Sequence, residues 1–218
     1  MKDIYSKISC CKVSPYNLSL IIGLCGIVLL FIFQIKIAPY VLFVFLGFGW
    51  SLFFFRNHLN VVEIMLLSPL LFYCIFVSYI SFCSLLGVRL TVFCAIIFIV
   101  LSFWVFVSKK VFSSKNLDCK VSKVDMLFCF ILIIALVSKV APIIGMYAPN
   151  LSDEITHSYY AKLIVDTGRI PFFYSPGLHI ISAYSNMLGG DGVVKQILYI
   201  TNFFSAYSGV AMYIYIKR

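Results

Sequence analysis

The sequence predicts an all-α membrane protein, a polytopic transmembrane helical bundle with about six spans and an outer loop of short interfacial helices. Three observations support this fold class. Of the 218 residues, 62% are hydrophobic and 11% are charged, which is more apolar surface than a soluble protein of this size can bury. Apolar runs of about 20 residues, the length that crosses a bilayer, recur along the chain. The basic residues are distributed unequally among the connections between these runs.

Six apolar runs are candidate spans, at residues 18–35, 37–55, 61–87, 90–108, 124–148 and 193–216. The first four are joined by very short connections, so we expect them to form two tight hairpins. No small-residue cleavage site follows the first run, which argues against a cleaved signal peptide. The chain therefore divides into an N-terminal four-span region, residues 1–123, and a second region of two spans with an external loop, residues 124–218.

The basic residues indicate the orientation of the spans. A cytoplasmic N-terminus places the larger set inside: Lys2, Lys7, Lys12, Arg56, Lys109, Lys110, Lys115, Lys120, Lys123, Lys217 and Arg218. The smaller set then lies outside: Lys36, Arg89, Lys162, Arg169 and Lys195. This asymmetry is typical of proteins in the cell membrane, whose cytoplasmic loops are the more basic. The net charge of +9 thus indicates contact with anionic membrane lipids and not with nucleic acid.

The outer segment, residues 149–192, is where ionisable groups gather. It holds four of the eight acidic residues and two of the three histidines: Asp153, Glu154, Asp166, Asp191, His157 and His179. It contains no cysteine, which excludes a disulfide framework there. We expect one helix from Ser152, as N-cap, to about Thr167. A second helix is expected with Ser175 as N-cap and Pro176 at its first position, ending near Leu188.

Helical spacing places particular side chains together on these two helices. In the first, Asp153, Glu154 and His157 share a face with Ser158 and Ala161, opposite Ile155, Tyr159 and Leu163. In the second, the polar face is formed by His179, Ser182, Ala183 and Asn186. Each helix is thus expected to present a histidine beside small residues, which leaves room for a ligand.

The residues of this face suggest two kinds of chemistry. A carboxylate such as Asp153 can take the proton from an attacking hydroxyl. Asp153 and His157, four residues apart, can also act as paired ligands of a divalent cation, so Mg or Mn is the cofactor we expect. The alternative is purely structural, because acids in the first turn of a helix stabilise it against the macrodipole.

The run "DEITHSYYAKLIVDTGRIPFFYSPGLHIISA" resembles the first large outer loop of the GT-C superfamily of integral membrane glycosyltransferases. The resemblance covers about residues 140–216, and the positions that carry it are Asp153, Glu154, His157, Ala161, Gly168, Pro171, Tyr174, Pro176, Gly177 and His179. Protein O-mannosyltransferases and oligosaccharyltransferases belong to this superfamily. Its members place the loop after their first span, whereas four further spans come before that one here.

The resemblance implies a function and a role for each residue. The donor would be a polyprenyl-phosphate-linked sugar, and the acceptor would lie on the outer face. Asp153 would be the catalytic base or a metal ligand, supported by Glu154. Substrate would be bound by His157, His179, Lys162, Arg169 and Tyr174.

Members of that superfamily have more than six spans. We therefore expect this chain to be the N-terminal part of a larger enzyme, completed by a downstream polypeptide. The alternative is a non-catalytic membrane protein, either a transporter or flippase or an assembly subunit. Transporters place polar groups at the bilayer midplane, whereas the charges here lie at the rim, which favours the enzyme.

Overall fold

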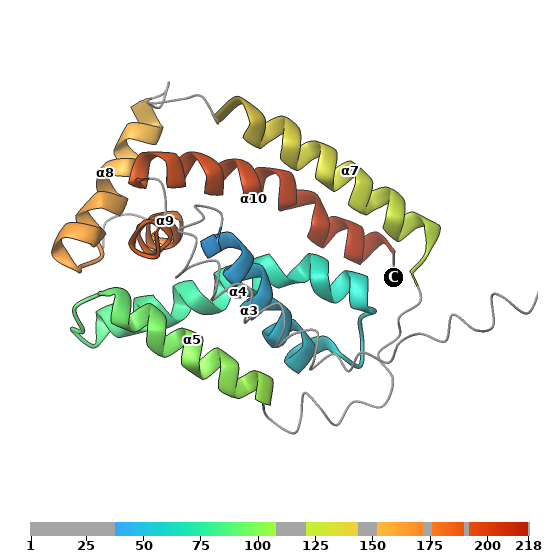
Figure 1. The fold of residues 1–218 in the computed structure, drawn as a ribbon, viewed down its shortest axis with the longest axis horizontal. Helices are drawn as coiled ribbons and strands as arrows, with labels where there is room; N and C mark the ends of the chain where they lie inside the picture. Colours follow the sequence, from blue (N-terminus) through green and yellow to red (C-terminus); the bar gives the residue numbers. More distant parts are fainter. Residues whose placement is uncertain (1–37, 108–120, 144–151, 172–175, 190–191, 218) are drawn as a thin grey trace, which may run out of the picture.

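The computed structural model describes residues 38–107, 121–143, 152–171, 176–189 and 192–217. Within these ranges the chain is all-α: it forms seven α-helices and one 3₁₀ turn, and no strand. The elements, shown in Figure 1, are α3 (Ala38–Phe55), α4 (Val61–Leu85), α5 (Val92–Val107), α7 (Lys123–Val140), η1 (Ala141–Ile143), α8 (Ser152–Thr167), α9 (Gly177–Met187) and α10 (Val193–Ile216).

Five of the six predicted runs fall mainly within the described residues, and four of these match observed helices to within about two residues at each end. Among the described helices, α4 and α10 are long and apolar enough to cross a bilayer, while α3 and α5 contain shorter apolar stretches. The run expected to continue to residue 148 ends as an α-helix at Val140 and turns into η1, which contains Pro142. The expected span at residues 18–35 lies outside the described residues.

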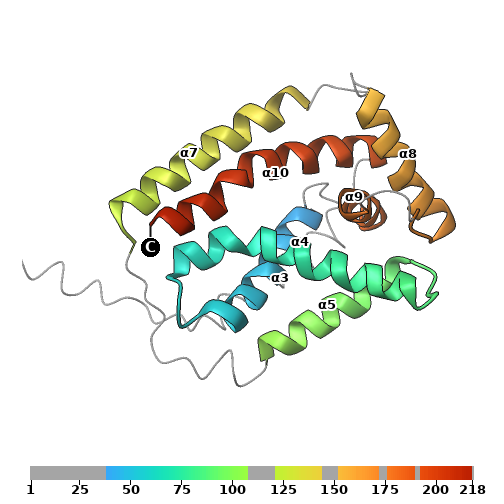
Figure 2. The same ribbon diagram turned by 180° about the vertical axis from the view of Figure 1, so that it is seen from behind.

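One hydrophobic core joins the N-terminal helices to the C-terminal ones. Figures 1 and 2 show α9 almost end-on, and it contacts α8, α10, α4 and α5. Phe72 and Phe76 of α4 stack in this core, and the ring of Tyr184 from α9 meets Phe76 edge-on at 5.2 Å between centroids. The α8–α9 segment is therefore supported by side chains from both parts of the chain.

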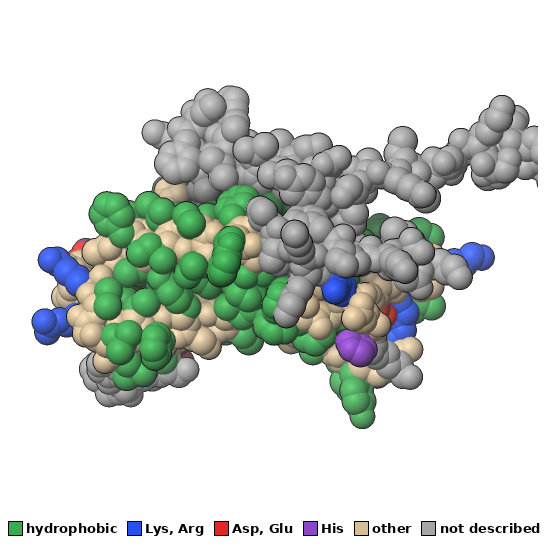
Figure 3. All heavy atoms as spheres, turned by 90° about the horizontal axis from the view of Figure 1, so that it is seen from below, with side chains coloured by type: hydrophobic (Ala, Val, Ile, Leu, Met, Phe, Trp, Pro, Cys, Tyr) green, Lys and Arg blue, Asp and Glu red, His purple; other side chains and the backbone are tan. Residues whose placement is uncertain are grey.

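Large apolar side chains also cover the outer faces of two helices. On α7 the exposed residues are Met126, Leu127, Phe130, Ile131, Ile133, Ile134 and Val137, and on α5 they are Phe93, Ile96, Ile97, Val100, Leu101 and Trp104. Figure 3 shows how hydrophobic side chains spread over the side on which α5 lies. A surface of this kind is unfavourable in water and is well solvated by lipid.

Candidate functional site

The C-terminal end of α8 is held against the connection between α4 and α5. Leu90 N–H donates a hydrogen bond to the Gly168 carbonyl oxygen over 2.8 Å. Gly168 has a φ of 67°, and a Cβ there would lie 2.6 Å from Arg89 Cγ. Only glycine adopts this backbone and allows this approach without strain.

The start of α9 is fixed in a similar way against α4. A Cβ on Gly177 would lie 2.1 Å from Tyr73 Oη, so a larger residue cannot occupy this position without displacing the tyrosine. Pro176, expected at the first helical position, is instead the residue before the helix, at its N-cap position. The glycines of the GT-C-like run thus serve helix packing, which accounts for their presence without any catalytic role.

The structure brings the two predicted histidines into direct contact. His157 Nδ1 of α8 and His179 Nε2 of α9 are 2.8 Å apart, a hydrogen-bond distance, with ring centroids 5.0 Å apart. The ring of Tyr160 meets His179 edge-on at 5.5 Å. Asp153 lies one turn before His157 on the same helix and is exposed. The two imidazoles therefore meet where α8 packs on α9, and Asp153 lies on the same helix as His157 without a described contact to either ring.

The polar face of α9 differs from the expectation. His179, Ser182 and Ala183 are fully buried, so this face points into the protein and leaves no room for a ligand beside His179. Its neighbours there are His157 and Tyr160. His157 is half-buried, so of the two histidines it is the one that solvent can reach, and its ring contacts the buried His179.

The remaining predicted site residues are more peripheral. Lys162 Nζ and Asp166 Oδ2 form an exposed ion pair at 2.8 Å on α8, and Arg169 is also exposed, just after that helix. Glu154 belongs to α8, but its side chain, like the whole of Tyr174, lies outside the described residues. An exposed i,i+4 pair such as Lys162–Asp166 contributes about 0.3–0.5 kcal/mol to stability.

A groove runs along the face of α8 that carries Ile155 and Tyr159, and neither Asp153 nor His157 lines it. Its volume is about 450 Å³. Its lining combines α8 with the end of α9 and the start of α10: Ile155, Ser158, Tyr159, Lys162, Val165, Asp166, Asn186, Gly192, Val193 and Val194. Most of these side chains are apolar, and the Lys162–Asp166 pair supplies the charge.

Within the described ranges, no group of three or more His, Cys, Asp and Glu residues is arranged to hold a metal ion. Asp153 and His157 share a face of α8, and His157 Nδ1 is already engaged with His179. The described residues thus do not form a resident site for Mg or Mn, and metal dependence stays a prediction.

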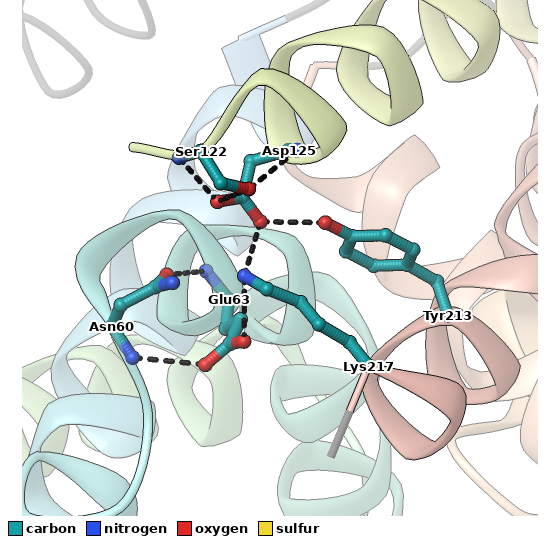
Figure 4. Close-up of polar contacts among 6 residues, drawn as sticks. All are labelled: Asn60, Glu63, Ser122, Asp125, Tyr213 and Lys217. Atoms are coloured by element: carbon teal, nitrogen blue, oxygen red, sulfur yellow. Dashed lines mark hydrogen bonds and ion pairs between the residues drawn. The ribbon is translucent and has the colours of Figure 1, made fainter. Parts of the chain in front are cut away.

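A second polar site lies at the other end of α10, and sequence reasoning missed it. This ion cluster consists of Glu63 of α4, Asp125 of α7 and Lys217 just after α10, with Asn60, Ser122 and Tyr213 around them (Figure 4). Lys217 Nζ lies 2.5 Å from Asp125 Oδ1 and 3.0 Å from Glu63 Oε1. The Tyr213 hydroxyl also donates to Asp125 Oδ1, over 2.5 Å.

Each acid of the ion cluster also caps its own helix. Asn60 N–H donates to Glu63 Oε2, and the Asn60 side chain accepts from Glu63 N–H, both over 2.9 Å. Ser122 and Asp125 form the same reciprocal capping box at the start of α7. Burial of Lys217 disfavours its charged form, but its hydrogen bonds to Asp125 and Glu63 outweigh this and raise the pKa of the lysine.

The sequence did carry a signal for this cluster. The spacings N-x-x-E at residues 60–63 and S-x-x-D at residues 122–125 are those of capping boxes. They identify two acids at helix starts, but nothing in the spacing connects either of them to a lysine far along the chain.

Comparison of the chain with protein-family models, curated proteins and solved structures finds no match. The resemblance to the GT-C loop therefore rests on the motif residues themselves.

Proposed function

We propose that this protein is a membrane glycosyltransferase that moves a sugar from a polyprenyl-phosphate-linked donor to an acceptor on the outer face of the cell membrane. The observation that carries the proposal is the contact between His157 and His179. It assembles two residues of the GT-C-like run, 22 positions apart, one helical turn from Asp153.

The arrangement suggests how a transfer would proceed. The acceptor hydroxyl oxygen attacks the anomeric carbon of the donor sugar, while the Asp153 carboxylate takes the hydroxyl proton. The bond between that carbon and the lipid phosphate oxygen breaks, and the phosphate leaves with the electron pair. His157, oriented by its hydrogen bond to the buried His179, would hold the acceptor or the phosphate. Glu154 would support Asp153.

The groove beside α8 fits an amphiphilic donor. Its apolar walls suit part of a lipid chain. Lys162, which lines the groove, could bind a phosphate in place of its exposed partner Asp166. Arg169 and Tyr174 remain candidate substrate contacts. The groove lies at the start of α10 and the ion cluster at its end, about 36 Å apart for a 24-residue helix. This separation matches the bilayer thickness and supports a placement of α8 and the ion cluster at opposite surfaces of the membrane. The distribution of basic residues assigns α8 to the outer surface.

The test is substitution of Asp153 in native membranes, which hold the chain together with any polypeptide that completes it, with a labelled polyprenyl-phosphate sugar as donor. Asp153→Asn preserves size and removes the base, and a lost general base costs about 10²–10⁴ in rate. We expect normal accumulation of this variant with at least a roughly hundredfold lower kcat, and a smaller loss for Glu154→Gln.

Asp166→Asn is the matched control, because it removes an acid from the same helix that is paired with Lys162 on the exposed surface. It should transfer sugar almost as fast as the wild type. Near-normal transfer by Asp153→Asn would show that this carboxylate is not the catalytic base and only stabilises the start of its helix. Failure of native wild-type membranes, which hold the chain together with any polypeptide that completes it, to use any polyprenyl-phosphate sugar would contradict the proposed function itself.

A further inference from the structure

The helix α7 is attached to the described bundle along a narrow contact. It packs on α10 and continues into η1. Among its described side chains only Asp125 and Leu132 are buried, while its outer face is apolar and exposed. In a bilayer, lipid tails solvate such a face as well as another helix does, so hydrophobic burial does little to hold α7 in place. The polar contacts at its first turn therefore matter more than they would in water.

Lys217 connects three helices at this point. Its ammonium follows α10 and is shared between a carboxylate of α4 and one of α7. The capping boxes engage Glu63 Oε2 and Asp125 Oδ2, which leaves Oε1 and Oδ1 directed at the ammonium (Figure 4). The helix caps thus orient the very oxygens that bind the lysine.

We propose that Lys217 is a tethered cation that locks α7 to α4 and α10, and that opening this lock releases α7 from the bundle. The site formed by α4 and α7 is accordingly a receptor for a primary ammonium group, which the end of α10 supplies within the chain. This role is separate from the proposed sugar transfer at α8 and does not depend on it.

The charges predict an order of effects among substitutions. Removing Lys217 leaves two buried carboxylates facing each other without a cation, which repels α7 from α4. Removing the charge of Asp125 leaves Lys217 paired with Glu63 and weakens the two contacts that Asp125 accepts from the end of α10, those from Lys217 and from the Tyr213 hydroxyl. Lys217→Ala should therefore open the lock more completely than Asp125→Asn.

The experiment measures the position of α7 directly. Spin labels are placed on Val137 of α7 and Ile97 of α5, which are 60% and 53% exposed, in the full chain with its own cysteines replaced, in lipid nanodiscs. Their distance distribution is recorded by pulsed electron paramagnetic resonance. We expect one narrow distribution with Lys217 present, and in Lys217→Ala a distribution broadened or shifted by several ångströms. Propylammonium at millimolar concentration should restore the narrow distribution.

Lys162→Ala is the matched control, since it removes an exposed ion pair of α8 and should leave the distribution unchanged. An unaltered distribution in Lys217→Ala would overturn the lock, as would a melting temperature lowered without movement of α7. If Lys217→Ala accumulates poorly, Lys217→Ala combined with Asp125→Asn and Glu63→Gln removes the uncompensated charges. Movement of α7 in this triple variant supports the lock, and a fixed α7 refutes it.

Discussion

A close approach between α3 and α4 gives a specific prediction about Gly47. This residue of α3 is buried against α4, and a Cβ there would lie 1.9 Å from the Ser68 carbonyl oxygen and 2.6 Å from its carbonyl carbon. These are backbone atoms of a helix, which cannot move aside as the end of a flexible side chain does. Small residues at such positions let transmembrane helices approach closely.

The expected cost of Gly47→Ala follows from this geometry. Even a close carbon–oxygen contact keeps about 3.3 Å, so α3 must move from α4 by about 1.4 Å. That shift also disturbs the stacked rings of Phe43 and Phe72, whose centroids are 4.6 Å apart. Overpacking of this kind costs about 1–3 kcal/mol, and sometimes more, against a gain of about 1 kcal/mol in helix propensity. We expect a net loss of about 2 kcal/mol because the obstructing atoms are rigid.

The assay compares Gly47→Ala with Gly209→Ala by thermal unfolding in detergent, followed by gel filtration of the protein that remains monodisperse. Gly209 lies in α10 with nothing within 4 Å of its added Cβ, so alanine there should raise stability by up to about 1 kcal/mol. For a chain of this size, 2 kcal/mol corresponds to a fall of about 4–8 °C in Tm. Equal melting temperatures for the two variants would refute the close contact between α3 and α4.

Two further predictions concern orientation and pH. Because basic residues are concentrated on the expected cytoplasmic side, Ser152→Cys in a cysteine-free chain should react with an impermeant thiol reagent added outside, whereas Ser114→Cys should not. The opposite labelling pattern would invert the topology. The pKa of Lys217 is raised above its ordinary 10.5, so its stabilising charge is present below that pH and is lost as the pH rises through the folded value. As the pH rises above 10.5, the wild type should lose more thermal stability than Lys217→Met, and equal losses would contradict this assignment.

The positions of the long helices were predictable because a bilayer offers the backbone few alternatives. An apolar run of about 20 residues can satisfy its own amide groups only as a helix. The run at residues 61–87 became α4 at Val61–Leu85, and the run at residues 193–216 became α10 at the same bounds. Hydropathy did not predict where α7 ends. Val140 is followed by a 3₁₀ turn that contains Pro142, which has no amide hydrogen to continue the helix.

The candidate site was predictable in its residues but not in its arrangement. Clustering of acids and histidines in one segment pointed to Asp153, His157 and His179. It did not show that His179 would be fully buried, because a polar helix face is normally expected to face solvent or a ligand. In a chain with so much apolar surface, polar side chains turn inward toward one another. The contact between His157 and His179 follows that rule.

The ion cluster was predictable from local sequence only in part, because its acids belong to capping motifs but its lysine is brought to them by the fold. The capping spacings at residues 60–63 and 122–125 predict that one carboxylate oxygen of Glu63 and one of Asp125 accept a hydrogen bond at the start of their own helices. Their second oxygens then need a partner, because a buried carboxylate with half its hydrogen bonding unmet is costly. Lys217 meets both needs at once, 92 residues after Asp125 in the chain. The two capping motifs thus leave one oxygen of each carboxylate without a local partner, and the packing of α4, α7 and α10 supplies that partner. Lys217→Ala should therefore disturb the arrangement of these helices more than it disturbs any one helix.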